Sequence, residues 1–274
     1  MKSLPYTATK ERDRKVFELA REFLLGLPEI TEDRLGKYLV PHGTQHPKTV
    51  AGIYEKLLGA AQERQMGNNV IGAAVGGTHR LGVVLCGFEP QAVLSKYESR
   101  DAVLDAIVAQ LRPRGQVRRT PRSLWPKFCE TVLAGASFLV QFGTAEEFYR
   151  WVDFFDRDER ARAALPMLLS YEVAGLGFAL ACMFLMELGY TQFGKPDVHL
   201  RATFEALGLS RTDGDYDVFK AIVRMARHVG ETPSAVDKLF WLIGSGVFYL
   251  DGELRTGRNR DRFINYARER LRGD

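Results

Sequence analysis

The residues Gly175-Leu176-Gly177 constrain the fold of this chain more than any other short segment. Two glycines two positions apart permit a tight turn and leave backbone amides uncovered. An apolar run, Phe178 to Leu188, follows and is expected to form a buried helix that ends at the next glycine. Amides at a helix start bind anions such as phosphate oxygens. The segment therefore predicts a glycine hairpin that leads into a helix and presents amides to an anionic partner.

A carboxylate follows this helix. Asp197 comes directly after Pro196, at the predicted start of the next helix. The free amides and the dipole of a helix N-terminus stabilise a carboxylate in its charged form. Next to a nucleotide whose phosphate is bound, such a group can stabilise a cationic sugar or position a water for attack at the anomeric carbon. The alternative is that Asp197 only caps the helix.

Most of the sequence predicts helices separated by Gly, Pro and Asp. With 274 residues, of which 46% are hydrophobic and 26% charged, the chain can bury a sizeable core. We predict a mostly α, two-lobed fold, with lobes 1–123 and 124–274 packed as one compact unit. Leu81 to Phe88 has the pattern of a strand or of a buried loop. Helices are expected at residues 10–26, 31–39, 47–66, 91–95, 101–111, 124–141, 145–155, 158–170, 178–188, 197–207, 215–229, 233–244 and 259–271.

Composition argues against several classes of protein. Three cysteines lie far apart and predict reduced core thiols (Cys86, Cys129 and Cys182). Phosphate-binding loops, dinucleotide-binding motifs, zinc-protease motifs and nucleophile elbows are missing from the sequence, and five dispersed histidines suggest no metal site. The first residues carry no signal-like apolar stretch, and the longest apolar segment is too short to cross a bilayer. We therefore expect a cytoplasmic monomer without a membrane partner or a cofactor.

A basic loop is the second feature that points to a polyanion. Residues 112–127 contain six basic residues and no acidic one, with Pro and Gly between them. Such a loop binds phosphates without reading sequence. Arg118, Arg119 and Arg122 are the candidates for these contacts; a solvated charged loop is the alternative. The net charge of +4 agrees with a polyanionic partner.

In this order, the hairpin, the apolar helix and the aspartate resemble the core of the helix-hairpin-helix (HhH-GPD, endonuclease III-like) DNA glycosylases. In that superfamily Leu-Pro-Gly-x-Gly-x-x-Thr-Ala leads through an apolar helix to Val-Asp-Thr-His. Here Glu172 to Ala181 leads to Pro196-Asp197-Val198-His199, and the next helix runs into Leu207-Gly208-Leu209. The resemblance covers residues 124–209 and, more loosely, residues 47–71.

The resemblance implies roles for individual residues. Asp197 would be the catalytic carboxylate, and Gly175 and Gly177 would contact DNA phosphates. Lys195 departs from the family, which usually has an apolar residue there. Its ammonium group is a candidate for contacting a phosphate or for holding Asp197, and an exposed lysine on a turn is the alternative. His199 is expected to pack or cap locally. The hairpin carbonyls of similar proteins hold a monovalent cation, so a structural cation is expected here as well.

One residue departs from the family pattern in a way that changes the chemistry. Bifunctional members carry a lysine just inside the helix after the hairpin, which forms a Schiff base with the sugar. Counting back 18 residues from Asp197 gives Ala179. Because alanine cannot be a nucleophile, we expect water to attack and the DNA strand to stay intact. Lys195 is the one candidate substitute for this lysine.

A glycosylase must also fill the gap left by the extruded base and hold that base in a pocket. Gln65 and Asn68 are candidates for filling the gap, and Trp125 and Trp241 for walls of the pocket. Trp241, with Asp237 nearby, is similar in place to C-terminal residues near the pocket of archaeal oxoguanine glycosylases. Polar helix-terminal amides and core aromatics are the respective alternatives.

The leading hypothesis is a monofunctional DNA glycosylase, associated with the nucleoid, that acts on double-stranded DNA with a damaged or modified base. A non-catalytic DNA-binding protein that keeps the hairpin is the second hypothesis, and an unrelated helical interaction protein is the third. Alkylated purines, oxoguanine, uracil-type lesions and bulky modified pyrimidines of phage all stay open as substrates. The function is accordingly repair or defence against phage.

Overall fold

The computed structural model describes residues 3–40, 46–63, 70–252 and 254–271. The chain divides into two compact units, each described by itself below. Unit 1 combines residues 1–44 with residues 189–274, and unit 2 is the continuous segment 45–188. The predicted boundary after residue 123 instead falls inside unit 2, between two helices that contact each other. Contacts between distant parts of the chain, which cannot be read from composition, define these units.

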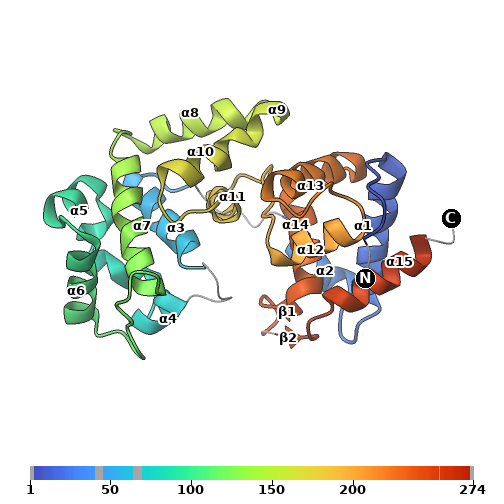
Figure 1. Cartoon of the computed structure of the whole chain (residues 1–274), viewed down its shortest axis with the longest axis horizontal. Coiled ribbons are helices and arrows are strands. Elements are labelled where there is room, and N and C mark those ends of the chain that lie inside the picture. Colours follow the sequence, from blue (N-terminus) through green and yellow to red (C-terminus); the bar gives the residue numbers. More distant parts are fainter. Residues whose placement is uncertain (1–2, 41–45, 64–69, 253, 272–274) are drawn as a thin grey trace. The chain divides into compact units, whose positions relative to one another are not determined.

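The described residues are mostly helical, which confirms the predicted fold class (Figure 1). Unit 1 contains α1 (Lys10–Leu25), α2 (Glu32–Leu39), α12 (Val198–Ala206), α13 (Asp215–Val229), α14 (Pro233–Ser245), β1 (Val247–Phe248), β2 (Leu254–Arg255) and α15 (Arg260–Leu271). Unit 2 contains α3 (Val50–Ala61), α4 (Val70–Val75), the 3-10 helices η1 (Thr78–Val83) and η2 (Cys86–Phe88), α5 (Pro90–Lys96), α6 (Arg100–Leu111), α7 (Leu124–Leu139), α8 (Ala145–Asp156), α9 (Glu159–Arg162), α10 (Ala164–Glu172) and α11 (Phe178–Glu187).

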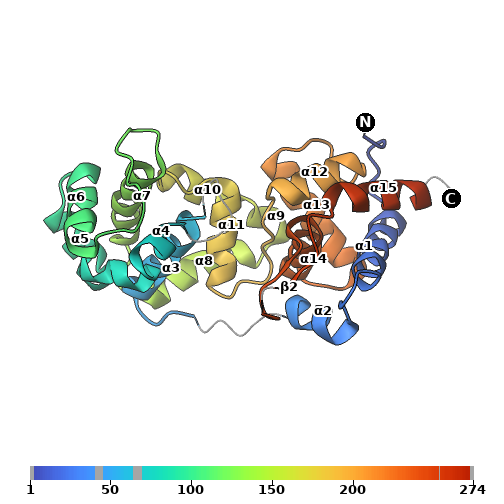
Figure 2. The ribbon, with the colours of Figure 1, turned by 90° about the horizontal axis from the view of Figure 1, so that it is seen from below.

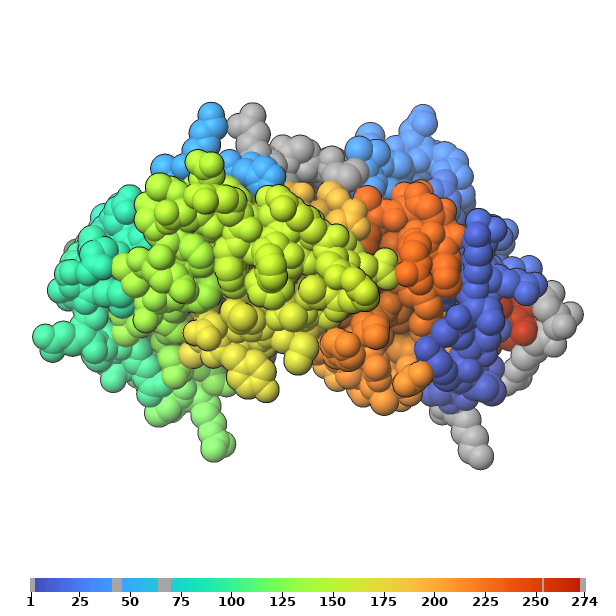
Figure 3. Space-filling view, turned by 90° about the horizontal axis from the view of Figure 1, so that it is seen from above, coloured from blue at the N-terminus to red at the C-terminus, as the bar shows by residue number. Residues whose placement is uncertain are grey.

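Unit 1 joins the two ends of the chain around one apolar core. Helix α1 packs on α13, α14 and α15, and the space-filling view shows blue N-terminal residues beside orange residues of the C-terminal half (Figure 3). Aromatic rings pack edge to face through the core. The ring centre of Phe240 lies 5.1 Å from that of Phe204 and 6.0 Å from that of Phe263. Phe263 in turn lies 5.4 Å from Phe23 of α1. Aromatic contacts of this kind add to the burial energy of the core.

Unit 2 is built around α3, which contacts both α7 and α11 (Figure 2). Tyr54 of α3 is fully buried and donates a hydrogen bond to the carbonyl of Val132 in α7. Gly135 of α7 permits this close packing, since a Cβ there would lie 3.0 Å from Leu57 and 3.2 Å from Tyr54. Helix α11, which follows the glycine hairpin, therefore packs against a helix that is itself closely packed on α7.

Helix starts follow the caps that the sequence contains. Thr144 accepts a hydrogen bond from the amide of Glu147, and threonines in the same position begin α1, α2, α3 and α14. The predicted helix at residues 158–170 is two helices, α9 and α10, which divide at Ala163. The predicted helix at 47–66 is described from Val50 to Ala61.

Leu81 to Phe88 does not form a strand, so the strand interpretation of this segment is wrong. The segment forms 3-10 turns, and Gly87 takes a positive φ of 67° that interrupts extended backbone. Among the described residues, the strands are β1 and β2, which pair antiparallel in unit 1. Each strand has two residues, which is too short to produce an alternating pattern of side chains in the sequence.

Candidate functional site

The glycine hairpin joins α10 to α11 as the sequence predicts. Gly175 has a φ of 90°, a conformation that strongly favours glycine. The amide of Leu176 donates to the carbonyl of Val173 at 2.9 Å, which closes the turn. The Thr131 hydroxyl donates to the carbonyl of Ala174 at 2.8 Å and ties the turn to α7. The hairpin is thus held by the core of unit 2, and the expected cation there stays a prediction.

Gly177 begins α11 without a side-chain cap. Its φ of −61° and ψ of 165° suit any residue, and a Cβ there would meet no heavy atom within 4 Å. Neither the backbone nor the packing of the protein therefore requires a glycine at this position. The first amides of α11 have no carbonyl partner one turn earlier. The start of α11 is open to close approach from outside, and this is the property that an anion-binding hairpin needs.

Ala179 lies in the first turn of α11 and is half-buried. Met183 and Glu187 follow at intervals of four residues, so the three lie on one face of the helix. Both of these later residues line a pocket described below. Ala179 is thus on the pocket side of α11 and presents only a methyl group there.

Asp197 is the N-cap of α12, as predicted. Its Oδ1 accepts hydrogen bonds from the amides of His199, at 2.8 Å, and Leu200, at 3.1 Å. The side chain is half-buried, and Oδ2 accepts no hydrogen bond from any residue within the described parts of the chain. The carboxylate is therefore oriented through one of its oxygens, Oδ1.

The ring of His199 packs against the backbone of α14. A Cβ at Gly244 would lie only 2.3 Å from the Cγ of His199, so this glycine makes room for the imidazole. Burial lowers the pKa of His199, and its buried Nδ1 has no hydrogen-bond partner within the described residues. These contacts agree with the packing role expected for this histidine.

A second carboxylate supports the turn before Asp197. Asp237 of α14 is 5% exposed, and its Oδ2 accepts a hydrogen bond of 3.0 Å from the backbone amide of Lys195. Burial, and next the negative charge of Asp197, raise the pKa of Asp237 to about 7. The carbonyl of Lys195 accepts from the amide of Asp197 at 2.8 Å, which makes the turn tight. The sequence placed Asp237 near a pocket but contained no sign of this hydrogen bond.

The basic loop is exposed, as expected. Arg118, Arg119 and Arg122 all have exposed side chains, and Arg119 forms an ion pair of 2.5 Å with Asp105 of α6. The hydroxyl of Ser123 donates to the carbonyls of Arg118 and Thr120, both at 2.7 Å. The loop backbone is therefore held in place, and its three arginines are exposed although Arg119 is paired with Asp105.

The other predicted pocket residues have different surroundings. Trp125 is buried in α7, which matches the alternative of a core aromatic. Trp241 is half-buried, with the Lys238 ammonium 4.9 Å from its ring centre and Tyr249 at 6.0 Å. Gln65 and Asn68 lie outside the described residues.

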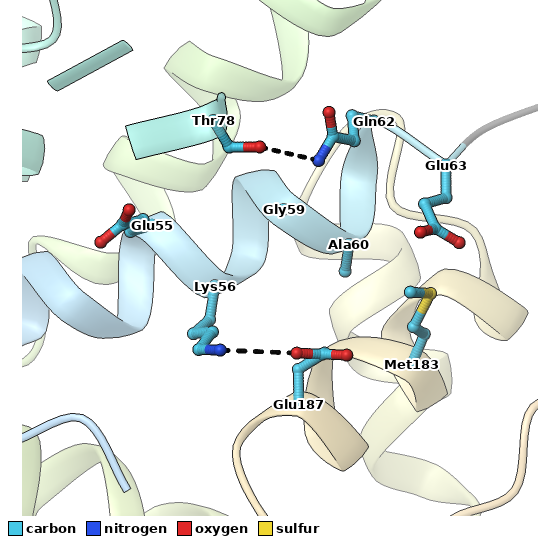
Figure 4. Close-up of a pocket in the computed structure, with 9 residues that line it drawn as sticks. All are labelled: Glu55, Lys56, Gly59, Ala60, Gln62, Glu63, Thr78, Met183 and Glu187. Carbon is cyan, nitrogen blue, oxygen red and sulfur yellow. Dashed lines mark hydrogen bonds and ion pairs between the residues drawn. The ribbon is translucent and has the colours of Figure 1, made fainter. Parts of the chain in front are cut away.

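A pocket that the sequence did not predict lies in unit 2 between α3, α11 and the start of η1 (Figure 4). Its volume is about 420 Å³. Lys56 and Glu187 meet across it at 3.5 Å, and the Gln62 amide donates to the hydroxyl of Thr78 at 2.9 Å. Glu63 and Met183 complete the part nearest the end of α3. The lining is mostly polar, with donors and acceptors from α3 and α11, and Ala60 and Met183 supply its apolar side chains.

Two negative findings apply to the described residues. None of their helices has both the length and the apolar character needed to cross a membrane. Among the same residues, no three His, Cys, Asp or Glu side chains gather in a way that could hold a metal ion.

No family model matches the chain, and no curated protein matches it significantly. Two solved structures are similar to it. One is the 8-oxoguanine glycosylase/lyase of Methanocaldococcus jannaschii in complex with DNA containing 8-oxoguanine, with 14% identity, a TM-score of 0.46, and coverage of 85% of this chain and 97% of that one. The other is the 8-oxoguanine DNA glycosylase of Thermotoga maritima, with 12% identity, a TM-score of 0.45, and coverage of 90% and 97%.

Proposed function

We propose that this protein is a monofunctional DNA glycosylase, which hydrolyses the N-glycosidic bond of a damaged or modified base and leaves an abasic site. The observation that carries the proposal is the geometry of Asp197. Its Oδ1 is fixed by two amides while Oδ2 accepts no hydrogen bond from the described residues. A carboxylate held in this way can stabilise the positive charge that develops on the sugar as the base departs.

The hairpin and the basic loop support DNA as the partner. The uncapped start of α11 offers amides for a phosphate, and the exposed arginines at 118, 119 and 122 add charge that favours a polyanion. A carboxylate near a polyanion is unfavourable unless it has a chemical task, which argues against the purely DNA-binding alternative. Lys195 is a further candidate for a phosphate contact.

Substitution of Gly177 with valine tests the role of the hairpin apart from stability. Because the position is open and its backbone conformation suits any residue, we expect the melting temperature to change little. DNA affinity should fall by about tenfold or more, roughly 1.4 kcal/mol, since the side chain would keep a phosphate away from the amides. Fluorescence anisotropy with a labelled duplex measures this affinity.

The matched control for this test is Gly36→Val, since Gly36 of α2 also has no heavy atom within 4 Å of an added Cβ. It should leave DNA affinity unchanged. Equal affinity of the Gly177 variant and the wild type would contradict a phosphate contact at the hairpin.

The absence of strand cleavage follows from Ala179. We expect borohydride to trap no covalent adduct between the wild-type protein and substrate DNA, because neither alanine nor water forms a Schiff base. The Ala179→Lys variant places an amine in the first turn of α11, where the helix dipole lowers its pKa, and should yield a trapped adduct. Denaturing gel electrophoresis resolves both species. An adduct with the wild type that disappears in Lys195→Ala would instead make Lys195 the nucleophile.

The pocket of unit 2 is the candidate for the extruded base. Its volume of about 420 Å³ lies in the range of ligand pockets, and Lys56, Gln62 and Glu187 offer both donors and acceptors. Polar groups of this kind select a base by its hydrogen-bonding edge.

The decisive test of the proposed function is release of a free base. The purified protein would be incubated with duplexes that each carry one alkylated purine, oxoguanine, uracil-type or bulky modified pyrimidine. Free base is detected by mass spectrometry, and abasic sites by alkaline cleavage. Release of a base from one class identifies the substrate. DNA binding without release from any class would favour the non-catalytic alternative.

A further inference from the structure

The connection from α11 to α12 is fastened to the start of α14 at two points. The amide of Ser234 donates to the carbonyl of Thr191 at 3.1 Å, and Asp237 accepts from the amide of Lys195 at 3.0 Å. Between these points the backbone of Gly194 lies so close that an added Cβ would be 2.6 Å from Ile222 and 2.9 Å from the carbonyl of Pro233. Gly194 therefore allows the connection to lie directly on α13 and α14.

The hydrogen bond from the Lys195 amide to Asp237 is the last of these attachments before Asp197. Pro196 is buried and removes one backbone donor from the turn, and the Asp197 amide bonds back to the carbonyl of Lys195. Few freely rotating bonds therefore separate the hydrogen-bonded amide of Lys195 from the carboxylate of Asp197. A displacement of the Lys195 amide would thus move Asp197 with it.

The charges around Asp237 make this attachment sensitive to ionisation. The negative charge of Asp197 disfavours ionisation of Asp237 and raises its pKa. The positive charges of Lys238 on α14 and Lys195 in the turn favour ionisation and lower that pKa. Helix α13 contributes the apolar Ile222 at the same turn. Burial lowers the pKa of His199 of α12, Asp197 opposes this shift, and the positive charges of Arg260, Arg258 and Lys195 add to it. With a pKa raised to about 7, Asp237 changes its charge near neutral pH.

We propose that Asp237 is a positioning residue for Asp197, which holds the Lys195–Asp197 turn through the backbone and strengthens the negative field at the reacting sugar when it ionises. This proposal rests on the proposed glycosylase function. This role differs from that of a residue lining a base pocket. The side chain of Asp237 is buried, and its Oδ2 accepts a hydrogen bond from the protein backbone.

The sign of the pH effect follows from the hydrogen bond. An ionised carboxylate accepts a stronger hydrogen bond from an amide than a neutral carboxyl group does. It also adds negative potential where the sugar becomes positive. The single-turnover rate constant for base release should therefore rise as the pH increases through about 7, the pKa of Asp237.

The experiment compares the wild type with Asp237→Asn, which keeps an oxygen acceptor and the side-chain shape but cannot ionise. We expect the variant to release base more slowly, about tenfold at pH 8, and to lose the rise near pH 7. DNA affinity should be equal or slightly higher, because a negative charge is removed. Glu231→Gln removes the same charge from an exposed side chain of unit 1 and should keep the wild-type pH profile.

A second measurement does not depend on activity. The ¹H–¹⁵N resonance of the Lys195 amide should shift with a midpoint near pH 7 in the wild type and stay constant in Asp237→Asn. A wild-type profile in the variant, or a Lys195 amide that does not titrate near pH 7, would overturn the proposal. If the wild type releases no base at all, the glycosylase function fails, while the NMR titration still decides whether Asp237 holds the turn.

Discussion

The Asp197→Asn variant is expected to bind DNA with nearly the affinity of the wild type and to lose base release by about 10²–10³-fold or more. Asparagine keeps the oxygen that accepts hydrogen bonds from the amides of His199 and Leu200, and it is also a good N-cap. The start of α12 should thus persist, and the negative charge alone is removed. Base release under single-turnover conditions and fluorescence anisotropy measure the two properties separately.

The control for this substitution is Glu205→Gln, the same loss of charge on an exposed side chain of the same helix. It should retain the full rate of base release. If Asp197→Asn also retained that rate, the carboxylate would be a cap and nothing more, and the proposed mechanism would be wrong.

The largest effect on stability is expected from Asp13→Ala. Asp13 of α1 is fully buried and accepts hydrogen bonds of 2.8 and 2.9 Å from Arg224 of α13, and its Oδ2 lies 2.7 Å from the Nδ1 of His228. Removal of the carboxylate leaves a poorly exposed guanidinium without its counter-ion. Breaking a buried pair in this way costs about 3–5 kcal/mol. Unit 1 should melt about 10 °C lower, as measured by calorimetry.

Two further variants separate the loss of the buried ion pair from the loss of a charge. Glu18→Ala removes an exposed acid from the same helix and should change the melting temperature by at most about a degree. The double variant Asp13→Leu with Arg224→Leu removes both charges and should recover part of the lost stability. A loss below about 1 kcal/mol in Asp13→Ala would mean that water or another group satisfies Arg224.

Most of the α-helices and the position of Asp197 could be predicted because their signals are local; α4 lies outside every predicted range. Thr144 marks the start of α8 by a side chain that bonds three residues ahead, and Pro196-Asp197 marks the start of α12. Leu81 to Phe88 was misleading because its apolar run resembles a strand while its glycines permit tight turns. A strand also needs a partner, which no local pattern supplies.

The rest of the candidate site depends on contacts between distant parts of the chain. The hydrogen bond from Lys195 to Asp237 spans 42 residues, and the pocket places Lys56 beside Glu187, 131 residues later. Neither pair has a spacing that periodicity could reveal. The division into units was missed for the same reason, since unit 1 is assembled from both ends of the sequence.

The two-part construction of unit 1 has a consequence for synthesis on the ribosome. Unit 2 is one continuous segment and can fold once residue 188 has left the exit tunnel. Near the N-terminus, the amides of Leu4 and Thr7 bond to the carbonyls of Ala206 and Gly208, so they wait for partners made about 200 residues later. The apolar residues of α1, such as Phe23, cannot reach their core partners until α12 to α15 have been made. The hairpin of unit 2 can therefore form before unit 1, which contains Asp197, is complete.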